Sequence, residues 1–163
     1  MGNVPVVPAR PAVPSGVTRI CVIGYSSSHN VGRAANLAAA IASAHPSAYE
    51  TWFYFSNFGY KKLLESVKNE DIPDSEKTKR GNLDNEKTIG EHTTAPFVWL
   101  EKSNADENES KKNIEAIGGR DMFAQWSGKT FPDNEDIQKL SDVAAPPAME
   151  MFGYAKIPTY NKK

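Results

Sequence analysis

One stretch of the chain constrains its fold more than any other, because it joins a buried strand to the start of a helix. Residues 17–25 (VTRICVIGY) are rich in branched apolar side chains, as is typical of a central strand buried on both faces. After a short polar turn, Ala34, Leu37 and Ile41 recur at helical spacing, which predicts an amphipathic helix that ends near Ala44. A buried strand followed directly by such a helix indicates an α/β fold.

The alternation of strands and helices continues as far as residue 127. An aromatic strand and a second helix are followed by a hairpin with a long charged tip and by a last short helix. Between the second helix and the hairpin, residues 69–92 carry almost no apolar side chains and are predicted to form a charged surface excursion. The predicted elements are a strand at 49–55, a helix at 59–69, strands at 93–102 and 113–119, and a helix at 120–126.

Two segments, residues 1–16 and 128–163, lie outside this pattern and are predicted to be extended arms. In the first, prolines recur at every third position, so they line one edge of a polyproline II segment that is about 28 Å long. The second carries scattered aromatic residues that can anchor a partner protein. The predicted partner-binding residues are Val4, Pro5, Pro8, Arg10, Pro11, Pro14, Phe152, Tyr154 and Tyr160.

The composition fits one soluble domain with an ordinary core, since 39% of the residues are hydrophobic and 24% are charged. The net charge of −1 gives no electrostatic reason to expect nucleic acid as a partner. No apolar run approaches 18 residues, so membrane insertion is not expected. Cys21 is the single cysteine, which excludes a disulfide framework and favours a reducing, cytoplasmic compartment. The three histidines lack metal-ligand spacing, so neither a metal nor another cofactor is expected.

Three short motifs of the chain resemble those of a known protein family. Residues 32–38 (GRAANLA) are similar to the helix that follows the glutaredoxin Cys-x-x-Cys turn, and Thr94-Ala95-Pro96 stands where that family has a cis-proline. The sequence Gly118-Gly119-Arg120-Asp121 is similar to the motif with which glutaredoxins hold the glutamyl end of glutathione. The resemblance covers residues 17–127. It implies a thioredoxin (glutaredoxin-like) fold with a central mixed four-stranded sheet flanked by helices.

The resemblance also implies a ligand groove in which the reactive groups have been replaced. Ser28 and Val31 stand at the positions of the two cysteines, and neither side chain can perform thiol exchange. The chain is therefore not expected to be an enzyme. Ser28 and Asp121 can also be helix caps only, and the two glycines can simply make a turn. The residues of this vestigial groove are Tyr25, Ser28, Val31, Ala95, Pro96, Gly118, Gly119 and Asp121.

These features predict a non-catalytic scaffold subunit of a larger protein assembly. Among redox-inactive thioredoxin-fold proteins, the chain is most similar to thioredoxin-like proteins that associate with cortical microtubules in apicomplexan parasites. That similarity implies a cytoskeletal location, with tubulin and other microtubule-associated proteins as partners. Two alternatives stay open at this point. One is a structural subunit of an organellar complex, and the other is a glutathione- or peptide-binding sensor without redox activity.

Overall fold

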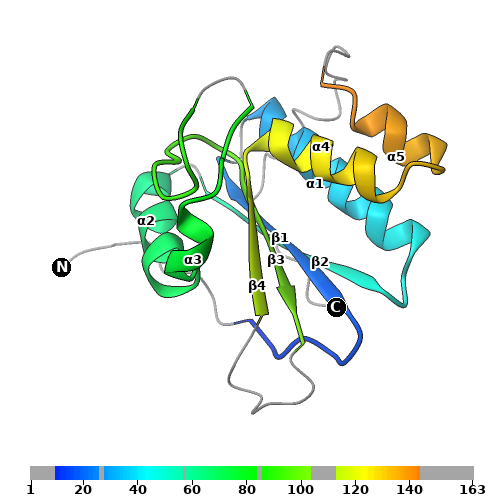
Figure 1. The fold of residues 1–163 in the computed structure, drawn as a ribbon, viewed down its shortest axis with the longest axis horizontal. Coiled ribbons are helices and arrows are strands. Elements are labelled where there is room, and N and C mark those ends of the chain that lie inside the picture. Colours follow the sequence, from blue (N-terminus) through cyan, green and yellow to red (C-terminus); the bar gives the residue numbers. More distant parts are fainter. Residues whose placement is uncertain (1–9, 26–27, 57, 84–85, 104–112, 144–163) are drawn as a thin grey trace.

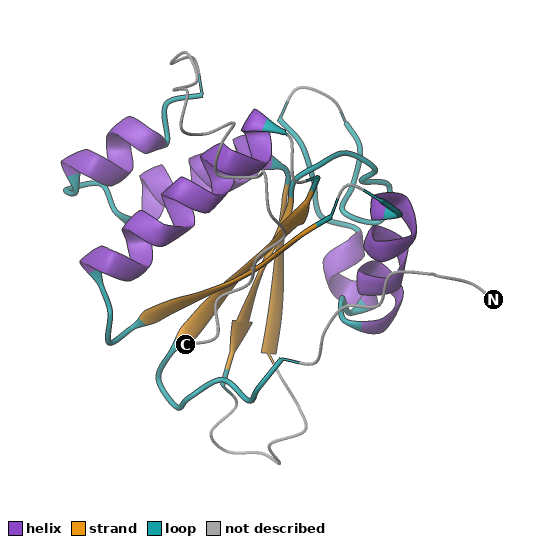
Figure 2. Ribbon diagram, turned by 180° about the vertical axis from the view of Figure 1, so that it is seen from behind, coloured by secondary structure: helices purple, strands orange, loops and turns teal. Residues whose placement is uncertain are grey.

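The computed structural model describes residues 10–25, 28–56, 58–83, 86–103 and 113–143. It has a four-stranded sheet with helices on both faces, so the chain is an α/β protein (Figures 1 and 2). Within the described residues, no helix is long and apolar enough to cross a membrane. The elements are β1 (Thr18–Gly24), α1 (His29–Ala44), β2 (Tyr49–Phe55), α2 (Tyr60–Glu70), α3 (Asp74–Lys77), β3 (Phe97–Lys102), β4 (Asn113–Gly118), α4 (Arg120–Thr130) and α5 (Glu135–Leu140).

The sheet is mixed, and its strand order is β2-β1-β3-β4. Strand β1 is parallel to β2, while β3 is antiparallel to both β1 and β4. The predicted mixed four-stranded sheet and the β3–β4 hairpin are thus confirmed. Strand β3 begins at Phe97 rather than at residue 93, because the chain turns at a cis peptide bond between Ala95 and Pro96.

Alternate residues of the strands face two separate apolar cores. Helices α1, α4 and α5 cover one face, where Ile20 and Val22 of β1 contact side chains such as Leu37 and Phe123. Helix α2 covers the other face, where Cys21 and Ile23 lie in a cluster with Tyr60, Leu63, Leu64 and Val67. Strand β1 is buried on both faces from Ile20 to Gly24, as its uninterrupted apolar run predicts.

Residues 69–92 pack against the domain more closely than their charged composition predicts. Ile72 and Ile89 are almost fully buried in the core beside α2. The Lys68 ammonium is also buried, and it donates to the backbone oxygens of Gly90 and His92 at 2.9 and 2.8 Å. Two isoleucines and one buried cation therefore hold the described parts of this segment against the domain.

Both predicted arms contribute residues to the folded domain. At the amino-terminal end, the Arg10 side chain is buried beside Trp52 and Trp99 on the α2 face of the sheet, and Val13 is also buried. At the other end, α4 continues to Thr130, and α5 inserts Ile137 into the core beside α1 and α4. The folded domain is therefore longer than residues 17–127 and includes residues 10–16 and 128–140.

Candidate functional site

Ser28 and Val31, which the resemblance places at the positions of the two cysteines, both contribute to the start of α1. The Ser28 hydroxyl oxygen caps α1 by accepting from the backbone N–H of Asn30 at 3.2 Å. Val31 is fully buried in the α1 core. Its side chain lies so close to Gly24 that a Cβ at Gly24 would be 2.4 Å from a Val31 methyl carbon. Neither Ser28 nor Val31 is presented to a ligand as a reactive group.

The segment before β3 approaches this turn. Its conformation is fixed by the cis Ala95–Pro96 bond and by Tyr60, whose hydroxyl donates to the Thr94 carbonyl at 2.8 Å. The ring of Tyr60 packs on Tyr25, with 4.8 Å between ring centres, and Tyr25 is 41% exposed. Burial raises the pKa of Tyr60 far above its ordinary value, so the hydroxyl remains a hydrogen-bond donor. Tyr25 and Pro96 thus lie at the same end of the sheet.

The Gly118–Asp121 turn is covered by a loop from residues 69–92. The backbone N–H of Gly119 donates to the Gly81 carbonyl at 3.0 Å. The Asp121 carboxylate accepts from Leu83 N–H at 3.2 Å and from Met122 N–H at 2.8 Å. The glutaredoxin resemblance assigns this turn to a ligand, and the protein's own loop bonds to its Gly119 N–H and to its Asp121 carboxylate.

A polar hollow of about 220 Å³ remains beside this turn. It brings together three of the predicted groove residues, Ala95, Gly119 and Asp121, while Tyr25, Ser28 and Val31 do not line it. In the described ranges, no group of three His, Cys, Asp or Glu side chains is placed to hold a metal ion. The full lining is Asn30, Asn82, Thr94, Ala95, Gly119, Arg120 and Asp121.

His92 is fully buried and connects Asn82, which lines the hollow, to the carbonyl of Pro96. Its Nε2 lies 3.1 Å from the Pro96 carbonyl, and its Nδ1 lies 3.3 Å from the Asn82 amide nitrogen. The Asn82 amide and the Pro96 carbonyl fit a neutral ring that carries its proton on Nε2. Burial lowers the pKa of His92, and the nearby Lys68 charge adds to this effect.

The pKa of an unperturbed histidine, as in an unfolded chain, is about 6.5. Because the pKa of His92 is lowered in the folded protein, we expect the protein to lose stability as the pH falls through this value. Below that pH the unfolded chain binds a proton that the folded protein excludes. Between pH 7 and 5, we expect the free energy of unfolding to fall by about 1 kcal/mol more in the wild type than in His92→Asn. Urea unfolding at both pH values measures this difference. Equal losses in the two proteins would contradict a neutral, buried His92.

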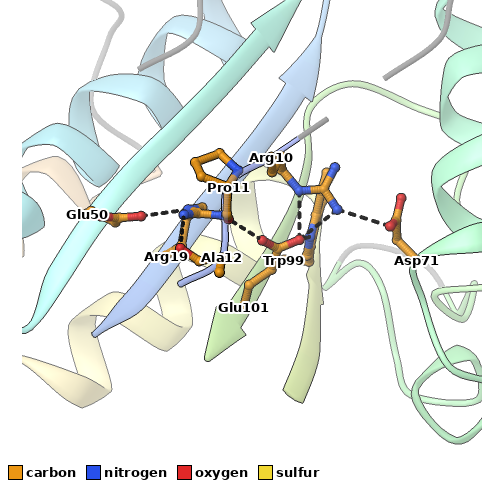
Figure 3. Close-up of polar contacts among 8 residues, drawn as sticks. All are labelled: Arg10, Pro11, Ala12, Arg19, Glu50, Asp71, Trp99 and Glu101. Atoms are coloured by element: carbon orange, nitrogen blue, oxygen red, sulfur yellow. Dashed lines mark hydrogen bonds and ion pairs between the residues drawn. The ribbon is translucent and has the colours of Figure 1, made fainter. Parts of the chain in front are cut away.

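A second polar site lies at the opposite end of the sheet, where β1 begins (Figure 3). Its centre is the fully buried Glu101 carboxylate, and each of its oxygens accepts from a different arginine. Oε2 lies 2.8 Å from Arg10 Nε, and Oε1 lies 3.2 Å from Arg19 Nη1. The indole N–H of Trp99 donates to Oε2 at 3.1 Å. We call this set the Arg10–Glu101 cluster, which comprises Arg10, Arg19, Glu50, Asp71, Trp99 and Glu101.

Arg10 connects the amino-terminal segment to both α2 and the sheet. Its Nη2 lies 3.0 Å from the Asp71 carboxylate at the end of α2. Its guanidinium carbon lies 5.1 Å from the ring centre of Trp52 and 5.4 Å from that of Trp99, which are cation–π distances. Burial opposes the charge, but the carboxylates of Glu101 and Asp71 outweigh it and raise the pKa of Arg10. Arg10 therefore stays charged in the folded protein.

Arg19 holds the residues that follow Arg10. It donates to the backbone carbonyls of Pro11 at 2.8 Å and of Ala12 at 3.4 Å. On its other side, its Nε lies 2.7 Å from the Glu50 carboxylate on β2. The cluster thus fixes residues 10–12 over the end of the sheet. Both oxygens of its buried Glu101 carboxylate accept hydrogen bonds.

The predicted partner-binding residues have three different locations. Arg10 belongs to the interior of the domain, and its side chain is only 5% exposed. Pro11 and Pro14 lie on the surface and are exposed. The remaining predicted anchors, Val4, Pro5, Pro8, Phe152, Tyr154 and Tyr160, lie outside the described residues.

Comparisons of the chain with protein-family models, with curated proteins and with solved structures found no match.

Proposed function

We propose that the protein is a non-catalytic, thioredoxin-like (glutaredoxin-like) structural subunit of a larger protein assembly. The observation that carries this proposal is the 3.0 Å hydrogen bond from Gly119 N–H to the Gly81 carbonyl. It uses internally a backbone donor that the resemblance assigns to a ligand. Ser28 adds support, because its hydroxyl caps α1 in place of a nucleophilic thiol. Cys21 is fully buried within β1, away from that turn.

The assembly that we propose is a microtubule lattice with its associated proteins, which places the protein in the cytoskeleton. Support comes from the similarity to thioredoxin-like proteins of cortical microtubules. The net charge of −1 favours a site on the inner wall or among other bound proteins, since the outer surface of tubulin is acidic and attracts basic proteins. The attachment segments in this proposal are the two ends of the chain, residues 1–9 and 144–163.

Co-sedimentation with stabilised microtubules tests this proposal. We expect the full chain to pellet with microtubules and a chain that lacks residues 1–9 to stay largely in the supernatant. The shortened chain keeps Arg10, so the Arg10–Glu101 cluster is intact and loss of folding does not explain the result. If the full chain stays in the supernatant, the microtubule proposal is contradicted. If both chains pellet equally, attachment through residues 1–9 is contradicted.

A sensor that binds glutathione or a similar peptide is the second candidate. The polar hollow of about 220 Å³ favours it, because the polar residues Asn30, Thr94 and Arg120 line it together with Ala95, which precedes the cis-proline. Under this alternative, ligand affinity depends on Arg120 and is unchanged by removal of residues 1–9. Under the structural proposal, removal of residues 1–9 changes assembly and no ligand binds the hollow.

A further inference from the structure

A hollow of about 240 Å³ lies beside β4, which is an edge strand of the sheet. Helix α4 lines it, and so do residues 79–80, which follow α3. We call this hollow the β4 groove. It is separate from the hollow near the cis-proline, because the two have no lining residue in common.

Part of the lining of the β4 groove is apolar. Ile117 of β4 lies there with two residues of α4, Met122 and Trp126, which pack against the α1 core and stay half-buried. One face of α4 supplies the positions i, i+3, i+4 and i+7, which are Met122, Gln125, Trp126 and Lys129. A helix rises about 1.5 Å per residue, so this face is about 10 Å long. An extended chain covers the same length with about three residues.

Trp126 brings a hydrogen-bond donor to the groove. Its ring is held by aromatic neighbours, since it stacks on Phe123 with 6.0 Å between ring centres and meets Phe131 edge-on at 5.9 Å. The indole N–H of Trp99 donates to Glu101, whereas that of Trp126 has no acceptor among the described residues. An indole beside an apolar surface is typical of protein interfaces, where its N–H finds a partner.

The exposed part of the lining is basic. Lys79 and Arg80 lie on one side, and Lys129 lies in the last turn of α4. Glu115 is the single acidic residue of the lining, and it pairs at 3.5 Å with a lysine outside the groove. Lys79 pairs with Glu76 at 2.7 Å, but Lys129 has no acidic partner in the described part of the chain. Three cations against one carboxylate favour an acidic ligand.

We propose that the β4 groove binds a short acidic segment of a partner protein. One apolar side chain of the segment packs against Met122 and Trp126, and its carboxylates pair with the exposed cations. Strand addition to β4 does not hold the segment, because Ala116 N–H already donates to the Glu76 carboxylate at 2.9 Å. The inference rests on the proposed function, in which the protein is a subunit of an assembly, and it adds the chemistry of one partner.

NMR titration of the full chain with the blocked peptide acetyl-Glu-Glu-Leu-Glu-Glu-amide tests the groove. We expect a saturable shift of the Trp126 indole N–H signal, with a dissociation constant of about 1 mM or below. The indole signals of Trp52 and Trp99 should not move, because both rings are buried on the α2 face of the sheet. The peptide of opposite charge, acetyl-Lys-Lys-Leu-Lys-Lys-amide, should cause no saturable shift.

Charge reversal at Lys129 tests the basic residues of the groove. We expect Lys129→Glu to weaken binding of the acidic peptide roughly tenfold, because it places a carboxylate beside those of the ligand. Lys139→Glu is the matched control. Lys139 is also an exposed lysine in the last turn of a helix, α5, but it lies outside the lining, and the net charge changes equally. We expect this variant to change the affinity by about twofold or less.

Three results would overturn the proposal. The first is no saturable shift of the Trp126 signal at about 5 mM acidic peptide. The second is equal binding of the two peptides, a comparison that needs no variant. The third is equal weakening in Lys129→Glu and Lys139→Glu, which would show general attraction to the protein's charge. Peptide binding is measured on the free protein and microtubule pelleting separately, so failure of one is distinguishable from failure of the other.

Discussion

Replacing Glu101 with glutamine is expected to lower the free energy of unfolding by about 3 kcal/mol. Glutamine keeps the shape of the side chain but removes the negative charge that Arg10 and Arg19 share. Both oxygens of the Glu101 carboxylate accept from N–H groups of arginine or tryptophan. In glutamine one of these oxygens is replaced by an N–H₂ group, so two hydrogen-bond donors would face each other. Asp71 and Glu50 still pair with the two arginines, which limits the loss.

Urea unfolding of the full chain measures this effect, with Glu115→Gln as the matched control. Glu115 also pairs with a cation, Lys102, but at 3.5 Å and with both side chains well exposed. Such surface pairs contribute little, so the control is expected to change stability by about 0.5 kcal/mol or less. A loss in Glu101→Gln no larger than in the control would show that the Arg10–Glu101 cluster does not stabilise the fold.

Replacing Gly118 with alanine is expected to cost about 3 kcal/mol or more, for two separate reasons. Gly118 has a φ of +115°, a conformation that residues with a Cβ rarely adopt. An added Cβ would also lie 2.3 Å from the Gly81 carbonyl oxygen, which is backbone and cannot rotate away. Gly81 must then move, and the Gly119–Gly81 hydrogen bond breaks with it.

Two glycine controls separate these causes. Gly16 also has a positive φ, +80°, but its added Cβ would meet no atom within 4 Å, so Gly16→Ala should cost only about 1 kcal/mol. Gly128 lies inside α4 with its nearest neighbour at 3.9 Å, so Gly128→Ala should be neutral or stabilising by up to about 1 kcal/mol. Equal losses in Gly118→Ala and Gly16→Ala, measured by urea unfolding, would contradict close packing of the loop on the turn.

Local sequence patterns were sufficient to predict most of the sheet and its main helices. Burial could be predicted from the apolar run at 17–25 and from the helical spacing of apolar residues in α1 and α2, since each of these elements packs along its length. The bond before Pro96, which stands where the glutaredoxin resemblance has a cis-proline, is cis. These features depend on residues that are close together in the sequence.

The two polar sites could not be predicted in the same way, because their partners are far apart in the chain. Arg10 and Glu101 are 91 positions apart, and nothing near Arg10 in the sequence indicates a buried carboxylate. A weak signal existed in Arg19 and Glu101, because each is a charged residue that adjoins an apolar run in its strand and needs a partner if it is buried. For the loop over the Gly118–Asp121 turn, the signal was Gly81-Asn82, a turn-forming pair within a charged run.

The most direct test of a ligand-free structural role is a glutathione titration of the full chain, followed by NMR at the backbone amides of Gly119 and Asp121. Gly119 N–H is bonded to the Gly81 carbonyl, and the Asp121 carboxylate is bonded to Leu83 N–H. We therefore expect neither amide signal to shift at about 10 mM glutathione. This concentration is high enough to detect a dissociation constant in the millimolar range. Saturable shifts at both amides, reduced in Arg120→Ala, would contradict the structural role and establish the hollow as a binding site.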